Sequence, residues 1–305
     1  MMNFLLTTAT VGGMLDLSFN GFDMAVFRFF GSIQNDVLTV IAKIFTAMGE
    51  TKYGIMLAIL GLILILFKRT RKYGLGIVIA IIIGTLLTNI VIKPMVLRIR
   101  PYNTLQEITE YFGWYTNAGL LAESDYSFPS GHTTIAVEVA VVLCLLFRSD
   151  NKKKIAWIFP VAAFLTACSR VYLMVHYATD VLAGILIGVI AGLLGYFISM
   201  AITRKCSSAF FWHRLDLERL FTKKSHKLIS KGTAAVCCII AWLIIFAVSF
   251  ISVMHAGGDS QRCAYDGDYK CYNEAQTGKK YPAIDGKYYC KIHWKELTES
   301  QDTAE

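Results

Sequence analysis

Three short runs of the sequence contain a Lys, three Arg, two His and an Asp, which are side chains that phosphate chemistry uses. They are residues 93–101 (KPMVLRIRP), 129–132 (PSGH) and 169–180 (SRVYLMVHYATD). Cations can hold phosphate oxygens, one imidazole can attack phosphorus, a second can protonate the leaving group, and a carboxylate can orient the attacker. Each run lies beside a membrane-spanning stretch, where ionisable side chains are costly and therefore indicate function. Together the runs predict a phosphate site.

The third run has the most specific spacing. His176 and Asp180 are four positions apart, so on a helix the carboxylate can fix the tautomer and orientation of the imidazole. Arg170 lies six positions before His176, within reach of the same site. Taken alone, this run could also be a surface His–Asp pair with an unrelated Arg. The occurrence of all three runs at one membrane face favours a shared site.

The first run places Lys93 and Arg100 seven positions apart, or about two helical turns. A helix that continues the preceding apolar stretch would put both cations on one face, and Pro101 would end it. Arg98 would then point away from them, and we leave it out of the predicted site. The alternative for the pair alone is two cations that snorkel to the membrane interface.

The second run opens an apolar stretch with the features of a phosphate cradle. Ser130 can cap the helix, and Gly131 allows a close approach to the backbone. The free amide groups and the positive end of the helix dipole favour an anion. The alternative is an ordinary Pro/Ser helix start followed by an interfacial His132.

The elements that must position these runs are membrane helices. The chain has 305 residues, of which 55% are hydrophobic and only 17% charged, which is too apolar for a soluble domain. Three uncharged stretches are each long enough to cross a bilayer: 73–92, 181–203 and 232–254. Three shorter or interrupted stretches bring the expected number of spans to six: 53–67, 133–147 and 155–173. The predicted fold class is therefore all-α, a polytopic transmembrane helical bundle.

The formal net charge of +8 follows the membrane topology. Sixteen of the 30 Lys and Arg fall in three connections, 68–72, 148–154 and 204–231, which alternate along the chain so that they share one side. The positive-inside rule makes that side cytoplasmic and puts the active site at the outer membrane face. We therefore expect a multi-pass cell-membrane protein that partners the bilayer and binds no nucleic acid.

The remaining segments divide the chain further. Residues 22–48 are amphipathic at helical spacing and predict an interfacial or re-entrant helix pair rather than a full span. No signal-peptide pattern precedes them. The expected divisions are an N-terminal segment 1–21, a membrane core 22–203, a basic cytoplasmic linker 204–231, an additional transmembrane helix 232–254 and an extracytoplasmic tail 255–305.

The cysteines divide by environment. Cys263, Cys271 and Cys290 lie in the tail, where a disulfide would leave one of them over. A zinc site that combines them with His255 or His293 lacks a paired Cys-x-x-Cys spacing, and we do not expect it. The other five are interpreted as packing residues: Cys144, Cys168, Cys206, Cys237 and Cys238. We predict no metal and no cofactor.

Two further polar features leave alternatives open. Glu138 lies about six residues inside its span, and it is either functional or a protonated or hydrogen-bonded packing residue. Residues 102–127 contain four acids, no Lys or Arg, and aromatic residues clustered at 111–115. Such aromatics suit the headgroup level and predict a lid or lateral entry for a lipid head, with a disordered acidic loop as the alternative.

The three runs resemble the signature motifs of the type 2 phosphatidic acid phosphatase and vanadium haloperoxidase superfamily. The matches are Lys-x6-Arg-Pro in 93–101, Pro-Ser-Gly-His in 129–132 and Ser-Arg-x5-His-x3-Asp in 169–180, all without a departure. The resemblance covers roughly residues 22–203, and the architecture looks like the bacterial membrane branch that includes undecaprenyl-pyrophosphate phosphatases. The segment after residue 204 has no counterpart in the family core.

The resemblance implies a role for each residue of the motifs. His176 is the nucleophile that forms a phosphohistidine, and Asp180 orients it. His132 protonates the departing oxygen and then deprotonates the water of the second step. The residues that hold the phosphoryl oxygens are Lys93, Arg100, Ser130, Gly131 and Arg170. The physical interpretation agrees, because phosphoryl transfer depends on fixed positive donors more than on covalent chemistry.

The expected function is a metal-independent integral membrane phosphatase that hydrolyses a lipid phosphate or pyrophosphate. Undecaprenyl pyrophosphate is the first expected substrate, followed by phosphatidic acid and phosphatidylglycerol phosphate. One alternative is a lipid phosphotransferase, and another is a non-catalytic lipid-phosphate transporter or binder. Binding alone would not require the His–Asp pair, which argues against the last. The sequence makes no prediction of the oligomeric state.

Overall fold

The structure is a computed structural model that describes residues 10–205, 243–248, 250–251, 262–267, 270–277 and 280–302. Within these ranges every regular element is a helix, and the only β-type pairings are isolated bridges such as that between Arg262 and Glu274. The predicted all-α class is confirmed.

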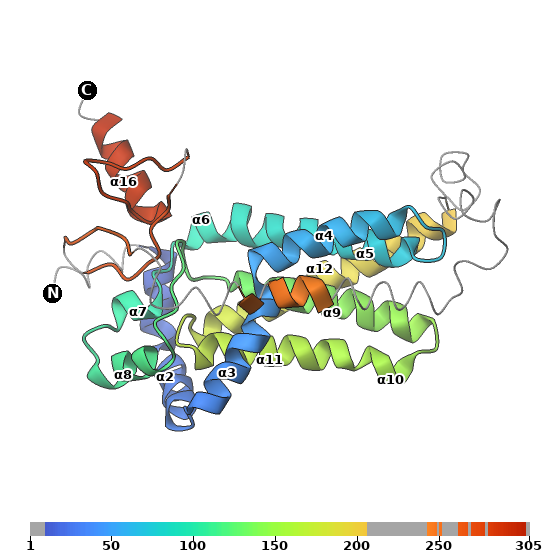
Figure 1. Ribbon diagram of the computed structural model, residues 1–305, viewed down its shortest axis with the longest axis horizontal. Helices are drawn as coiled ribbons and strands as arrows, with labels where there is room; N and C mark the ends of the chain where they lie inside the picture. The colour runs from blue at the N-terminus through green and yellow to red at the C-terminus, as the bar shows by residue number, and fades with distance from the viewer. Residues whose placement is uncertain are drawn as a thin grey trace.

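Five long helices form the bundle: α4 (Thr51–Ile65), α5 (Arg71–Thr85), α9 (Gly131–Ser149), α11 (Ile158–Tyr172) and α12 (Ala178–Lys205). Figure 1 shows them roughly parallel, with α12 packed against α5 and α9. Glycine permits this packing, since a Cβ added at Gly188 of α12 would lie 2.9 Å from the Thr134 carbonyl oxygen of α9. Small residues that bring helix backbones together are typical of membrane bundles.

The described residues contain four helical segments long and apolar enough to cross a membrane: Arg71–Thr104, Gly131–Ser149, Lys153–Tyr172 and Ala178–Lys205. A fifth span is counted if the bent pair Asp36–Gly49 and Thr51–Ile65, which meet at 46°, is one crossing. These segments overlap the first five of the six predicted stretches, of which 53–67 counts only as part of the bent pair. The sixth, 232–254, lies mostly outside the described residues, although 243–248 are helical, and it stays a prediction.

The helix that enters the first run does not continue to Arg100. After α5 the chain passes through a π-helical stretch, Leu86–Ile92, into the short α6 (Lys93–Val96). Pro94 has no N–H to donate to the preceding turn, which explains the irregular winding. Leu97 then adopts a left-handed conformation with φ 54° and ends the helix. The assumption that Lys93 and Arg100 share a helical face is therefore wrong, and a turn brings them together instead.

Two helices precede the bundle, as the amphipathic pattern predicts. The first, α2 (Val11–Ser32), begins well before residue 22, and the second is α3 (Asp36–Thr46). Thr10 and Asn35 cap them through their side-chain oxygens. A short η1 turn (Ala47–Gly49) connects α3 to α4.

The two described basic connections meet at one end of the bundle. Lys72 forms an ion pair with Asp150, and the Tyr73 hydroxyl donates to the same carboxylate over 2.5 Å. The three motifs lie at the other end, where Figure 1 shows α6, α7 (Pro101–Thr104) and α8 (Thr109–Asn117). The described part of the tail, which includes α16 (Lys291–Asp302), packs at this second end as well.

Candidate active site

The structure brings His176 and Asp180 together at the start of α12. His176 lies in the connection just before α12, and its Nδ1 is 3.3 Å from Asp180 Oδ2, with both side chains buried. A ring proton on Nδ1 directed at the carboxylate leaves the lone pair on Nε2. That nitrogen is 3.1 Å from Nη1 of Arg100, so the lone pair on Nε2 points at a buried guanidinium.

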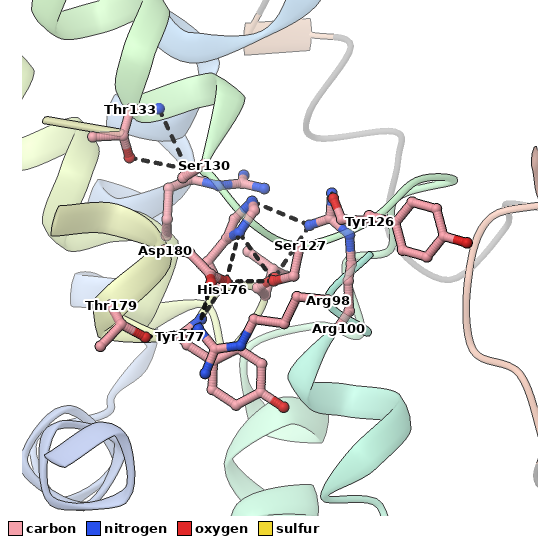
Figure 2. A network of polar contacts seen from close by, with 12 residues as sticks. Arg98, Arg100, Tyr126, Ser127, Ser130, Thr133, His176, Tyr177, Thr179 and Asp180 are labelled. Carbon is pink, nitrogen blue, oxygen red and sulfur yellow. Dashed lines mark hydrogen bonds and ion pairs between the residues drawn. The ribbon is translucent and has the colours of Figure 1, made fainter. Parts of the chain in front are cut away.

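Asp180 is held from several sides, as Figure 2 shows. The Ser127 hydroxyl and the Tyr177 backbone N–H, the latter over 3.0 Å, donate to its Oδ2. Arg98 Nη1 donates to Oδ1 over 2.6 Å. A buried carboxylate with donors on both oxygens has one orientation, and it can therefore fix that of His176.

Arg98, which the helical extrapolation leaves out of the site, contacts Asp180 directly. Its guanidinium is buried and donates to Asp16 over 2.8 Å and to Asp23 over 2.9 Å, besides Asp180. Because the helix ends at the left-handed Leu97, Arg98 does not have the position that a continuous helix would give it. A usable signal was present, because Asp16 and Asp23 are two turns apart on one face of an apolar helix and acids there require a cation.

Ser130, Gly131 and Lys93 come together at the start of α9. The Ser130 hydroxyl accepts the Thr133 backbone N–H over 3.4 Å and so caps the helix. The Ser130 N–H donates to the Asp180 carbonyl over 3.1 Å, which ties the second run to the third. A Cβ added at Gly131 would lie 4.0 Å from Lys93 Nζ. The helix start and the ammonium therefore face one space, suited to an anion.

His132 lies between two carboxylates. Its Nε2 is 3.3 Å from Glu50 Oε1, and its Nδ1 is 3.8 Å from Glu123 Oε1. The ring is nearly buried, with its side chain 9% exposed. A histidine in this position can donate a proton to a leaving oxygen and take one from water.

Arg170 approaches the site from the end of α11. Its Nη1 donates to Thr46 Oγ1 over 2.6 Å, and its Nη2 forms an ion pair with Glu123. Its buried Nε has no acceptor among the described residues. The structure thus brings together all eight residues proposed from the sequence, although several of them meet through shared partners.

Two acids of the connection before α9 form ion pairs with the three cations that the sequence predicts to hold phosphate. Asp125 accepts from Lys93 Nζ and from Arg100 Nη2, each over 2.6 Å. Glu123 contacts Arg170 and lies 3.8 Å from Arg100 Nη2. These carboxylates accept the hydrogen bonds that the cations would otherwise donate to a phosphate. Both acids are visible in the sequence of this loop, but nothing in that sequence predicts their contacts with the cations.

The acids remain ionised in this setting. Burial raises the pKa of Glu123, but the electrostatic interactions with His132, Arg100 and Arg170 outweigh this effect, and the pKa lies well below its ordinary value. For Asp125 the effect of burial is outweighed by Lys93 and a guanidinium, and its pKa is also far below the ordinary value. Both acids are therefore carboxylate anions beside these cations.

The pKa of His176 lies well below its ordinary value. Burial is the main cause, and the charge of Arg100 is the next. The ring is therefore neutral at physiological pH. A neutral imidazole is the form that can attack phosphorus.

Glu138 is buried between α9 and α5, away from these contacts. Neither of its carboxylate oxygens has a hydrogen-bond partner among the described residues. It lies against Gly84 of α5, where an added Cβ would clash with the carboxylate. Glycine thus makes the room for this acid.

The family model of the PAP2 superfamily matches residues 71–204, which include all three motifs. A phosphatidylglycerophosphatase B of Bacillus subtilis is 33% identical over 164 residues, and the match covers 51% of this chain and 70% of that protein. The chain belongs to the PAP2 superfamily, which confirms the resemblance seen in the motifs.

Other relatives agree. An undecaprenyl-diphosphatase of Sulfolobus acidocaldarius is 38% identical over 41% of this chain and 55% of its own length. A lipid A 4'-phosphatase of Bacteroides thetaiotaomicron is 30% identical over 47% of this chain and 60% of its own length. The chain therefore spans little more than half the length of these two relatives. All three relatives are named as phosphatases of lipid phosphates or diphosphates.

The fold also matches a solved structure. The crystal structure of a transmembrane PAP2-type phosphatidylglycerolphosphate phosphatase from Bacillus subtilis superposes with a TM-score of 0.51 and 26% identity. The match covers 66% of this chain and 94% of that one. The bundle is thus that of a membrane-embedded PAP2 phosphatase.

Proposed function

We propose that this protein is an integral membrane phosphatase that hydrolyses a lipid phosphate or diphosphate through a phosphohistidine. The observation that carries the proposal is the geometry at His176: Nδ1 against Asp180, and Nε2 directed at Arg100. Such an arrangement orients a nucleophile toward bound phosphate. Membership of the PAP2 superfamily and the names of the relatives support it.

In the first step, His176 Nε2 attacks phosphorus, the bond to the lipid oxygen breaks, and His132 gives that oxygen a proton. In the second step, His132 takes a proton from water, whose oxygen displaces His176 and releases phosphate. Charge on the transferring group is stabilised by Lys93, Arg100 and Arg170 together with the start of α9. The substrate phosphate must displace the carboxylates of Glu123 and Asp125 to reach these donors.

We place the active site at the outer face of a cell membrane. The support is the meeting of two basic connections, 68–72 and 148–154, at the opposite end of the bundle. Thr104→Cys and Asn151→Cys are expected to react with an impermeant maleimide from opposite sides, after subtraction of the labelling of the unsubstituted chain. Labelling of both from one side would contradict this topology.

Undecaprenyl pyrophosphate is the substrate we propose first, with phosphatidylglycerol phosphate and phosphatidic acid next, since the relatives are named for the first two lipids. The test is phosphate release by the purified protein from each of the three, at matched surface concentration in detergent. Orthovanadate should inhibit as a transition-state mimic. His176→Ala is the control for contaminating phosphatases.

The same assay separates the alternatives. Added lipid or sugar acceptors that gain phosphate while free phosphate falls would identify a phosphotransferase. Binding of all three lipids without product would identify a non-catalytic binder. Turnover is expected without added Mg²⁺, because three cationic side chains supply the charge, and strict dependence on Mg²⁺ would contradict that role for them.

A further inference from the structure

Four metal-ligating side chains converge in the tail, outside the active site. Cys263, Cys271, Cys290 and His293 are all buried, and their ligand atoms all lie within 4.8 Å of one another. His293 Nδ1 is 3.3 Å from Cys263 Sγ and 3.4 Å from Cys290 Sγ. The three cysteines are free thiols in the structure.

These separations suit a tetrahedral zinc site. Zinc–sulfur bonds of about 2.3 Å and zinc–nitrogen bonds of about 2.0 Å place neighbouring ligand atoms roughly 3.5 to 3.8 Å apart. A disulfide would join two of the sulfurs and leave the third with His293. Three sulfurs and one imidazole nitrogen form a complete tetrahedral ligand set. Ligands of this kind favour zinc over the hard cations.

Neighbouring groups hold the ligands in place. The His293 ring stacks on Tyr265 with the centroids 3.8 Å apart and the planes 5° from parallel. The Asn273 amide donates to Cys290 Sγ over 3.5 Å. Outer contacts of this kind orient metal ligands and lower the negative charge on a thiolate. Cys290 and His293 also stand three positions apart at the start of α16, which makes a Cys-x-x-His pair.

We propose that Cys263, Cys271, Cys290 and His293 bind one Zn²⁺. The ion holds the tail as a folded unit against the connection between α8 and α9, which contains Glu123 and Asp125. Binding releases the thiol protons and replaces a hydrophobic core that so short a segment cannot build. The site is structural, since all four positions are taken by protein ligands and none is open for water.

The contacts of the tail explain why its folding matters to the membrane core. The Glu274 N–H donates to the Glu123 carbonyl over 3.0 Å, and the Lys291 N–H donates to the Ser124 carbonyl over 3.2 Å. Asn273 Oδ1 accepts from the Tyr102 hydroxyl, also over 3.0 Å. The same asparagine thus contacts a proposed zinc ligand and the segment that follows Arg100.

The first test measures metal in the full chain purified in detergent without added zinc or chelator. Plasma mass spectrometry is expected to find about one zinc per chain. The same protein exchanged into Co²⁺ should show the thiolate charge-transfer band and the intense visible bands of tetrahedral cobalt. Zinc near zero together with no cobalt spectrum would overturn the proposal, as would a disulfide between any two of the three tail cysteines.

Variants assign the ligands. His293→Ala is expected to lose the zinc, whereas His293→Cys keeps it by offering a fourth thiolate. Cys168→Ser is the matched control, since this cysteine lies in α11 outside the cluster, and it should keep the full metal content. Equal zinc in His293→Ala and the control would contradict the assignment.

A third measurement needs no variant and reports on folding. Limited proteolysis is expected to spare residues 262–302 in the zinc-loaded chain and to cleave there at least tenfold faster after the zinc is stripped, while the bundle stays intact. Equal cleavage would show that the metal does not hold the tail. None of these readouts uses phosphatase activity, so they remain decisive even if the proposed function fails.

Discussion

The candidate site has two halves that satisfy their charges in different ways. In the orienting half, Asp180 forms an ion pair with the buried Arg98, and Arg98 is paired in turn with Asp16 and Asp23 of α2. In the phosphate half, the charges of Lys93, Arg100 and Arg170 are balanced by the carboxylates of Glu123 and Asp125.

Under the proposed function, the difference follows from what each half must do. The nucleophile needs one fixed orientation throughout the reaction, so its supports are buried and come from separate elements. The cations must be free for phosphate in one step and neutralised between turnovers. Their partners therefore come from a single connection, and a dianionic phosphate can replace them.

The largest effect should come from removing the nucleophile. His176→Ala is expected to lower turnover by roughly 10⁴ to 10⁶ and to abolish phosphoenzyme formation. His132→Ala should differ, because a good leaving group such as p-nitrophenyl phosphate needs no acid and should still phosphorylate it, while slow hydrolysis traps the adduct. Rapid-quench labelling and peptide mapping measure both. An adduct on His132, or normal turnover by His176→Ala, would refute the assignment.

Asp180→Asn should have the next largest effect. The amide keeps the size of the side chain but cannot hold the Nδ1 proton of His176, so turnover is expected to fall by roughly 10² to 10⁴. The affinity for vanadate should change little, because the phosphate half is intact. An equal loss of turnover and of vanadate binding would mean that the two halves are not separable.

Arg98→Lys tests the support behind Asp180. A single ammonium cannot bridge three carboxylates as the guanidinium does, so Asp180 should lose its fixed orientation and kcat should fall roughly 10- to 100-fold. KM should stay within about twofold, because Arg98 is a positioning residue that does not touch the substrate. A rise in KM with kcat unchanged would place Arg98 in the phosphate half instead.

Glu123→Gln tests whether the carboxylate of Glu123 competes with phosphate for the cations. Removal of the charge that competes with phosphate for Arg170 should lower the inhibition constant of vanadate by roughly three- to tenfold. Glu107→Gln is the matched control, since Glu107 is an exposed acid earlier in the same segment. Weaker vanadate binding by Glu123→Gln would show that the carboxylate assists binding rather than competes.

The smallest effect concerns pH. Because burial and Arg100 lower the pKa of His176, the ring stays neutral as the pH falls through its ordinary value of about 6.5. The rate of phosphoenzyme formation by His132→Ala should then change by less than about twofold between pH 8 and pH 6. Protonation should reduce it only well below pH 6. A midpoint at or above pH 6.5 would contradict the depressed pKa.

Much of the site could be predicted because its chemistry is concentrated in short motifs. His132, His176 and Asp180 need specific residue types at specific spacings, and those are visible in the chain. The contacts of Arg98 depend on one left-handed residue, Leu97, that nothing in the run requires. The direction of the chain after a helix end is set by tertiary packing. Extending the helix from Lys93 to Arg100 therefore gave the wrong position for Arg98.

The spans could be predicted for a similar reason, since an apolar stretch of sufficient length has few alternatives. The tail could not, because its fold rests on residues far apart in sequence. Cys263 and Cys271 are neither adjacent nor separated by a Cys-x-x-Cys spacing. Only Cys290 and His293 have a spacing in the sequence that is typical of metal ligands. Long-range convergence of small polar segments leaves little periodic pattern to detect.

The contacts of Arg98 also bear on how the protein can be divided. The family model begins at residue 71, yet the carboxylates that balance this buried guanidinium are Asp16 and Asp23 of α2. A fragment trimmed to the family boundary would keep every motif and leave a buried cation short of two counter-charges, a loss that typically costs several kcal/mol. A fragment meant to keep this buried ion-pair network must therefore also include Asp16 and Asp23 of α2.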